Sequence, residues 1–358
     1  MRKTNYLVLL FWCLMLASCT QQAEVTPELN NQRSLNNCIL DPQGNCIPGG
    51  PTGGNGGNNS SSFKVYMKGE SSSTVNQGAS SNGGTSWLAQ GGVTGAWTEF
   101  APSAVKYNGD IYVFYADLTN INGVPPQRIA FSRSTNSGFN WTNYTMDNGV
   151  SAAINAGTSA VAFNGQIYLA YKRVADNSIR ILTSNGLTGW SNHSEAVLSS
   201  ENTSGGEPYL AVHNNELYVF YTNNAGRVFY KKLNTFPSLL WDSPVDVTAE
   251  VNSSTVLSSG GVTAVSFNNT IHVIYKTNSD HLIAADALSL GTPQGHYVNN
   301  AQSSERPSVA TDGTRMVLLY KSQSNVKVRY STSTDGQTWF GNAYAVGDTR
   351  KAPYVISF

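Results

Sequence analysis

Basic residues recur at one position of a repeated segment, and this spacing is the clearest chemical signal in the sequence. Each of four lysines follows an apolar run that ends in Tyr or Met, and two arginines stand just before other apolar runs. Such a set supplies hydrogen-bond donors for an anionic or hydroxyl-rich ligand. We therefore predict a ligand-binding set that consists of Lys68, Lys172, Lys276, Lys321, Arg306 and Arg350. A rim of solvated charge is the alternative, because charged residues end most exposed strands.

Carboxylates at the strand ends of the first and third complete repeats offer a second kind of chemistry. A glycosidase uses two carboxyl groups about 5 to 10 Å apart, one protonated and one ionised. The candidates for such catalytic groups are Glu207, Asp117 and Glu99. The repeats are alike, however, and uniform repeats favour repeated binding sites over a single catalytic centre.

Other classes of site leave little trace in the sequence. The five histidines show no metal-ligand spacing, and neither a G-x-S-x-G motif nor a phosphate-binding glycine motif is present. Lys plus Arg and Asp plus Glu each number 22, so the charge balance gives no footprint for nucleic acid. We expect no metal, no cofactor and no nucleic-acid partner.

Five segments that carry these residues share one pattern of two apolar runs around a two-residue turn. They are "PSAVKYNGDIYVFYAD" (from Pro102), "TSAVAFNGQIYLAYKR" (Thr158), "PYLAVHNNELYVFYTN" (Pro208), "VTAVSFNNTIHVIYKT" (Val262) and "PSVATDGTRMVLLYKS" (Pro307). Asn-Gly, Asn-Asn and Asp-Gly turns adopt the positive φ of tight hairpins. The second run, as in "IYVFY", is apolar on both faces, so it must be covered on both sides. A radial stack of small sheets provides that cover.

The two ends of the repeat region complete each other. "FKVYMKGESS" from Phe63 aligns with a second run, whereas "APYVISF" at the C-terminus supplies a first run without the second. The predicted fold is therefore all-β, a six-bladed β-propeller of four-stranded blades over residues 63–358. Its closing blade joins the C-terminal strand to the N-terminal strands, which removes exposed sheet edges.

A second recurring unit follows the third predicted strand of several repeats. The copies are "SSNGGTSW" (from Ser80), "STNSGFNW" (Ser134) and "STDGQTW" (Ser333), and "TSNGLTGW" (Thr183) is looser. They resemble, imperfectly, the Asp box S-x-D-x-G-x-T-W of the sialidase superfamily and related bacterial repeat proteins. In this unit an amide or carboxylate should bind turn N–H groups, while Gly takes the left-handed conformation and Trp fills the gap between sheets.

The resemblance implies two functions for the propeller. Sialidases bind a substrate carboxylate with three arginines; Arg306 and Arg350 match two of them, while Phe100 stands where the first belongs. Propeller lectins instead use the clefts between blades. The tyrosines that end the second runs would line such clefts or form the core between blades. They are Tyr115, Tyr171, Tyr221, Tyr275 and Tyr320, with Met67 at the sixth position.

The first 62 residues carry targeting signals. Residues 1–18 place Arg2 and Lys3 before the run "YLVLLFWCLMLA", which is too short for a membrane span and is typical of a signal peptide. "LASC" resembles the lipobox of bacterial lipoproteins, which makes Cys19 the lipidated residue and residues 19–62 a flexible tether. Cys38 and Cys46 in this tether are predicted to form a disulfide in an exported chain.

These signals together predict an exported bacterial lipoprotein, held at the outer membrane or cell surface only through its lipid. Its propeller is expected to bind a glycan or a neighbouring surface protein without catalytic turnover. An exo-glycosidase of the sialidase-like superfamily and a protein-binding scaffold are the alternatives.

Replacing Cys19 by Ser is expected to abolish lipidation, because a hydroxyl group cannot form the thioether. Metabolic labelling with a fatty acid measures this, and the matched variant Cys38→Ser should keep its label. Label that survives in Cys19→Ser would contradict the lipobox.

Overall fold

The structure is a computed structural model of the 358-residue chain. It describes residues 39–40, 46–47, 62–118, 128–146, 154, 156–174, 176–188, 190–193, 206–235 and 240–358. The chain divides into two units, Met1–Asn58 and Asn59–Phe358. In the first, β1 (Ile39–Leu40) pairs antiparallel with β2 (Cys46–Ile47). The signal peptide, Cys19 and the side chains of Cys38 and Cys46 lie outside the described residues, so the predictions for them stay predictions.

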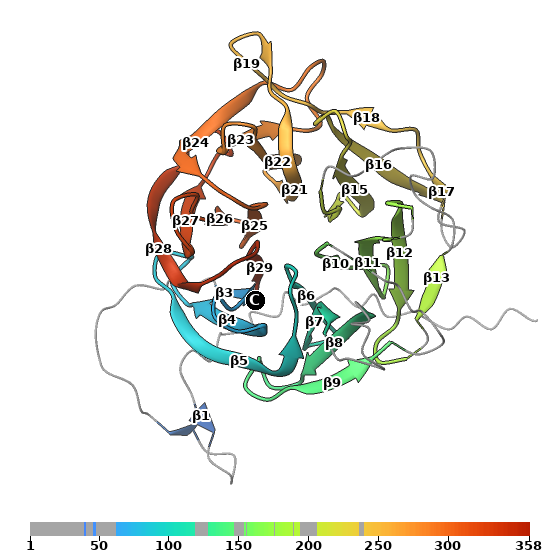
Figure 1. The fold of residues 1–358 in the computed structure, drawn as a ribbon, viewed down its shortest axis with the longest axis vertical. Helices are drawn as coiled ribbons and strands as arrows, with labels where there is room; N and C mark the ends of the chain where they lie inside the picture. The colour runs from blue at the N-terminus through green and yellow to red at the C-terminus, as the bar shows by residue number, and fades with distance from the viewer. Residues whose placement is uncertain are drawn as a thin grey trace, which may run out of the picture. The chain divides into compact units, whose positions relative to one another are not determined.

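The second unit consists of six small antiparallel sheets, here called blades, arranged in a ring (Figure 1). Blade 1 contains β6 (Ser103–Tyr107), β7 (Asp110–Asp117), β8 (Arg128–Ser134) and β9 (Thr142–Thr145). Blade 2 contains β10 (Ser159–Phe163), β11 (Gln166–Lys172), β12 (Ile179–Ser184) and β13 (Ser191–His193). Blade 3 contains β14 (Tyr209–His213), β15 (Glu216–Thr222) and β16 (Val228–Thr235), and both β17 (Leu240–Trp241) and β18 (Val245–Asp246) pair with β16.

The remaining blades follow the same order of strands. Blade 4 contains β21 (Ser258–Phe267), β22 (Thr270–Thr277), β23 (His281–Asp286) and β24 (Gly295–Gln302). Blade 5 contains β25 (Ser308–Thr311), β26 (Met316–Lys321), β27 (Lys327–Ser333) and β28 (Phe340–Asp348). The hairpin of β19 (Glu250–Val251) and β20 (Ser254–Thr255) stands between blades 3 and 4.

Blade 6 closes the ring from both ends of the unit. It has the order β29 (Tyr354–Ser357), β3 (Phe63–Lys68), β4 (Thr74–Ser80) and β5 (Leu88–Trp97). Tyr354 lies opposite Tyr66 and Ser357 opposite Phe63 in the antiparallel ladder. The innermost strands β6, β10, β14, β21, β25 and β29 contact one another in sequence around the ring. The predicted six-bladed propeller, with one C-terminal strand in its closing blade, is confirmed.

The hairpin turns explain the blade geometry locally. Both turn residues have positive φ in four of the five predicted hairpins, for example 49° at Asn108 and 86° at Gly109. In the fifth, Asp312 accepts hydrogen bonds from the backbone N–H groups of Thr314 and Arg315, and Gly313 has φ 85°. These short turns fix the register of the first and second strands, which brings each first strand to the ring axis.

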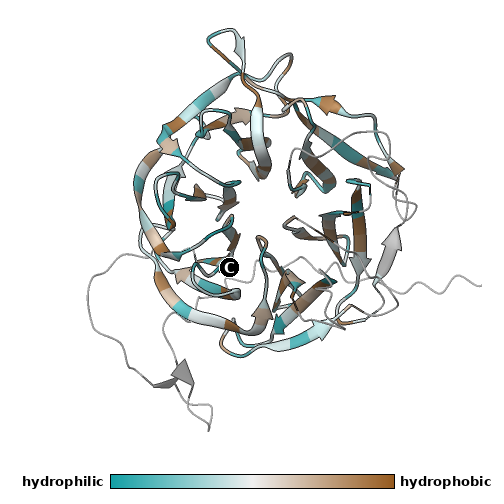
Figure 2. Ribbon diagram, in the orientation of Figure 1, coloured by the Kyte–Doolittle hydropathy of each residue, from teal (hydrophilic) through white to brown (hydrophobic). Residues whose placement is uncertain are grey.

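The second strand of each blade forms the core between blades. Each second strand carries a Tyr or Met near its end, and all six side chains are at most 2% exposed: Met67, Tyr115, Tyr171, Tyr221, Tyr275 and Tyr320. They belong to the interblade core rather than to open clefts. Figure 2 shows hydrophobic residues along the inner strands, whereas outer strands such as β24 and β28 also carry hydrophilic positions.

The turns between third and fourth strands share one hydrogen-bond pattern in three blades. In blade 1, the hydroxyl of Ser134 accepts from Gly138 N–H, and the Asn136 side chain accepts from Asn140 N–H at 2.8 Å. The Trp141 indole then donates to the Gly138 carbonyl at 3.0 Å. The turns after β4 and β27 repeat these bonds around Trp87 and Trp339. The expected local chemistry of the turn is therefore present, while its membership of the Asp-box family stays a prediction.

Deletion of residues 352–358 is expected to destabilise the whole ring, because it removes an inner strand and exposes the edge of β3. We expect the melting temperature to fall by about 10 °C or more, since 1 kcal/mol shifts it by roughly 2 to 4 °C at this size. The control is removal of Phe358 alone, which follows β29 and should change the melting temperature much less. Equal melting temperatures for the wild type and the longer deletion would contradict closure through β29.

Candidate ligand-binding site at one end of the central channel

The innermost strands enclose a channel along the axis of the ring. Its cavity has a volume of about 350 Å³ and a largely apolar wall. Three first strands place an alanine at the same position of this wall, Ala104, Ala160 and Ala264, while Leu210 and Val309 hold that position in blades 3 and 5. The wall of the channel is thus apolar, and the charged residues described below lie where the strands end.

The side of the ring where first strands begin and second strands end is here called the crossover face. At its centre, the Arg306 guanidinium lies 5.3 Å from the ring centre of Tyr209 and 5.9 Å from that of Tyr354. The two tyrosine rings are themselves stacked at 5.9 Å. Arg306 comes just before β25, whereas the tyrosines begin β14 and β29. One cation therefore links blades 3, 5 and 6.

Glu207 holds Arg306 in this place. The Arg306 Nε–H donates to Glu207 Oε2 at 2.7 Å, and the backbone N–H of Gly157 donates to Oε1 at 2.6 Å. A Cβ atom at residue 157 would stand 2.5 Å from the Glu207 carboxylate and 2.9 Å from Ala101, so this position needs glycine. The Arg306 side chain is only 2% exposed, yet its Nη1 and Nη2 atoms have no hydrogen-bond partner among the described residues.

Lys172 shares two features with Arg306: its side chain is buried, and it interacts with the charge of Glu207. Its side chain is buried, and burial lowers the pKa of its ammonium group, while the charge of Glu207 opposes that shift. No ion pair within 4 Å involves Lys172 in the described part of the chain. The structure thus brings Lys172, Arg306 and Glu207 into one charged cluster.

The other predicted basic residues are engaged more locally. Lys68 pairs with Glu99 at 3.3 Å, and the Ser73 hydroxyl donates to the same carboxylate. Lys276 pairs with Asp280 at 2.9 Å, and Lys321 donates to the Ser304 hydroxyl at 2.6 Å. Arg350 is exposed, and its charge helps to lower the pKa of Glu99.

The three carboxylate candidates have different partners. Glu207 lies in the central cluster, whereas Glu99 pairs with Lys68. Asp117 ends β7 opposite Arg128 in the ladder, and its charge acts on Tyr115.

Glu305, next to Arg306 on the crossover face, was not among the residues predicted for the site. Burial raises the pKa of its carboxyl group and the charge of Glu207 adds to the rise, while Lys351, Lys321 and Lys276 oppose it. Glu305 therefore lies within electrostatic reach of Glu207 and of three lysines. Its position next to Arg306 was visible in the sequence, but its burial was not.

The whole arrangement mixes donors and acceptors at the mouth of an apolar channel. Lysine and arginine donate, carboxylates accept, and the hydroxyl groups of a polyol do both. In the described residues no group of three or more His, Cys, Asp and Glu side chains is placed to hold a metal ion. The described residues also contain no helix that is long and apolar enough to cross a membrane.

Comparison with known proteins shows a shared fold. No family model and no curated protein matches the sequence. AofleA from Arthrobotrys oligospora matches with a TM-score of 0.56 and 13% identity, over 83% of this chain and 89% of that chain. The lectin of Aleuria aurantia, described as a six-bladed β-propeller with a novel fucose recognition mode, matches with a TM-score of 0.55 and 12% identity, over 80% and 92%. A variant of that lectin in complex with Fucα1-6GlcNAc matches with a TM-score of 0.54 and 13% identity, over 81% and 97%.

The raised pKa of Glu305 predicts a pH-dependent stability. The folded state binds the Glu305 proton more tightly than the unfolded state does. Glu305 therefore lowers the free energy of unfolding as the pH rises above about 4.3, the pKa of a glutamate in the unfolded chain. Glu305→Gln should therefore raise the melting temperature at pH 7 relative to the wild type, and the gain should vanish near pH 4. The matched variant Glu70→Gln, at a partly exposed carboxylate, should show no such gain. A lower melting temperature of Glu305→Gln at pH 7 would contradict the raised pKa.

Proposed function

We propose that the propeller is a lectin-like domain that binds carbohydrate at the crossover face without turning it over. The observation that carries this proposal is the Arg306 cluster. Arg306 uses only its Nε–H within the protein, although a guanidinium group has five N–H donors. The rings of Tyr209 and Tyr354 contact the guanidinium group. Glu207 supplies an acceptor beside it, and Lys172 supplies a second cation.

The fold supports the same proposal. The Aleuria aurantia lectin, whose structures are described with a fucose recognition mode and a bound Fucα1-6GlcNAc, has a propeller of the same number of blades. A ring of this kind is thus used elsewhere to bind sugars. The chemistry of the cluster supports a glycan as the partner here, and its cations favour glycans that carry an anionic group.

An anchored location completes the proposed function. The signal peptide and the lipobox at Cys19 would hold the domain at the bacterial outer membrane or cell surface, and residues 19–62 would keep it clear of the lipid headgroups. A domain held in this way can capture glycans or a neighbouring surface protein.

A specific observation favours the second candidate, an exo-glycosidase of the sialidase-like kind. Glu207 is bonded to a guanidinium group, whereas burial raises the pKa of the nearby Glu305. Carboxyl groups in such different environments are typical of an acid paired with an ionised partner. Phe100 stands where the resemblance to sialidases places the first arginine. This weighs against sialidase activity, because the substrate carboxylate would lose one of its three arginines.

A glycan array, run beside a release assay on the same glycans, tests the proposal with the full-length chain. We expect capture without release, and we expect Lys172→Gln to weaken capture by about tenfold, the value of one charge-assisted hydrogen bond of roughly 1.5 kcal/mol. Capture of an anionic glycan should also weaken with added salt. The matched control is Lys106→Gln, which removes the same charge from the far end of the channel wall.

Each other outcome has a definite meaning. Release by the wild type that is lost in Glu305→Gln would establish the glycosidase instead. Unchanged capture in Lys172→Gln would move the site away from the Arg306 cluster. Binding of a surface protein without binding of any glycan would favour the scaffold.

A further inference from the structure

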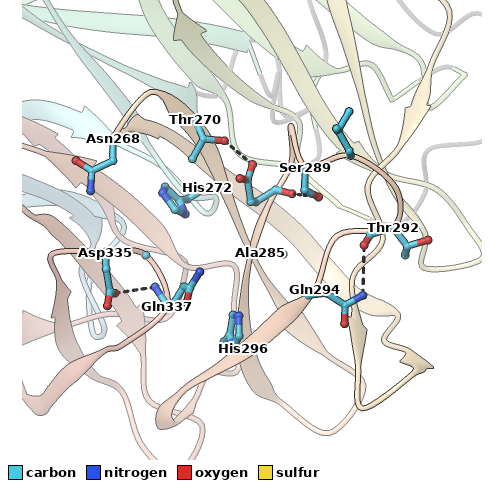
Figure 3. A pocket seen from close by; sticks show the side chains of 13 residues that line it. Asn268, Thr270, His272, Ala285, Ser289, Thr292, Gln294, His296, Asp335 and Gln337 are labelled. Atoms are coloured by element: carbon cyan, nitrogen blue, oxygen red, sulfur yellow. Dashed lines mark hydrogen bonds between the residues drawn. The ribbon is translucent and has the colours of Figure 1, made fainter.

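A second pocket opens on the opposite side of the ring, here called the turn face because the hairpin turns lie there. Its volume is about 370 Å³, which is within the range of small-molecule sites. Blade 4 forms one wall with its hairpin and with the long turn between β23 and β24. The turn that follows β27 in blade 5 forms the other wall with Asp335, Gly336 and Gln337 (Figure 3).

Several hydrogen-bond donors of this pocket are already used within the protein. The Asn268 amide donates to the Thr334 carbonyl at 3.2 Å, and the Gln294 amide donates to the Thr292 carbonyl at 3.3 Å. The Thr270 hydroxyl donates to the Asp286 carboxylate. The amide oxygens of Asn268 and Gln294 can accept hydrogen bonds, and Thr292, His296 and Gln337 add further polar groups to the wall.

Asp335 adds a charged acceptor to the wall. Its Oδ1 accepts from the backbone N–H groups of Thr338 at 2.7 Å and Gln337 at 2.8 Å. These bonds, with that of Thr338 the largest cause, lower the pKa of Asp335 to about 2. The carboxylate is thus ionised at neutral pH. Among the described residues that line the pocket, none is a Lys or Arg that could neutralise it or Asp286.

His272 supplies an acceptor that lacks a donor. The residue is 5% exposed and lines the pocket, and its Nε2 has no hydrogen-bond partner among the described residues. Burial lowers the pKa of the ring, which therefore stays neutral at pH 7, against the charges of Asp286 and Asp335. A ring N–H of His272 donates to the backbone of Phe267, and this bond opposes the lowering of the pKa. Because a neutral imidazole has only one N–H, Nε2 is then the acceptor.

This histidine is particular to blade 4. The equivalent position of the second strand contacts the turn glycine of the next blade in several repeats; Tyr112 lies near Gly186, and Val317 lies near Gly84. The ring of His272 lies against Gly336 in the same way, so closely that a Cβ there would overlap it. The equivalents in the other blades are Lys64, Tyr112, Tyr168, Tyr218 and Val317. Blade 4 thus places an imidazole acceptor where three blades place a phenol ring.

We propose that this pocket binds a small polyol that carries a protonated primary amine, as an amino sugar does. An ammonium group has three N–H donors and no acceptor, which complements two carboxylates and an unused imidazole nitrogen. Hydroxyl groups of the same ligand would donate to the amide oxygens of Asn268 and Gln294. The proposal does not depend on the crossover-face site, which is rich in cations and would repel such a ligand.

Calorimetric titration of the full-length chain with glucosamine, N-acetylglucosamine and glucose tests this proposal. The three probes differ only in the group at one carbon, and we expect glucosamine to bind at least about tenfold more tightly than the other two. Asp335→Asn should weaken glucosamine binding by about fivefold, the effect of one exposed charge pair of up to about 1 kcal/mol. The turn itself should survive, because Asn82 and Asn136 make the equivalent turn bonds in blades 6 and 1.

Two further variants locate the site. His272→Tyr copies the residue of blades 1 to 3, and it should abolish glucosamine binding by filling the pocket and removing the acceptor. Asn136→Asp adds a charge at the corresponding turn of blade 1 and should leave binding unchanged. Equal binding of the three probes, no glucosamine binding at millimolar concentration, or unchanged affinity in Asp335→Asn and His272→Tyr would each overturn the proposal. Loss of glucosamine binding in Lys172→Gln would also overturn it, because it would place the ligand on the crossover face.

Discussion

The antiparallel pairing of β29 with β3 is the contact on which the ring depends. Every second strand in this fold is buried on both faces, and only a closed ring covers both faces of all six. Without β29, the edge of β3 and the neighbouring faces of blades 5 and 1 would meet water. The same strand begins with Tyr354, which supports the Arg306 guanidinium. Closure of the ring and assembly of the charged cluster are therefore one event.

The sequence was sufficient for the fold because its signals are local or repeated. Asn-Gly and Asn-Asn turns specify hairpins from two residues, and the alignment of Lys68 with Lys172 reveals an incomplete repeat that the C-terminal run completes. The face on which a charged residue lies also follows from its place in the repeat. These inferences need only the length of the repeat and the positions of its turns, which lie alternately on the two faces of the ring.

Burial and pairing of the site residues were beyond such reasoning, because they depend on neighbouring blades. Lys68 and Lys172 occupy equivalent positions, yet one has a carboxylate partner at 3.3 Å and the other only the more distant charge of Glu207. Burial is the main cause of the raised pKa of Glu305, and the charge of Glu207 from another blade adds to it. The turn-face pocket likewise requires the long turn after β23 to meet Asp335 of the next blade. In the sequence, His272 was only one of five histidines without metal spacing.

Burial of Arg306 carries a free-energy cost. Removing a guanidinium group from water is unfavourable, and an apolar side chain of similar volume often gives equal or greater stability at such a position. Glu207 and the two tyrosine rings compensate for only part of the charge, since Nη1 and Nη2 find no acceptor among the described residues. A residue that served the fold alone would satisfy these donors or dispense with them. These unpartnered donors, beside a lysine and two carboxylates, are therefore the observation on which the proposed binding site rests.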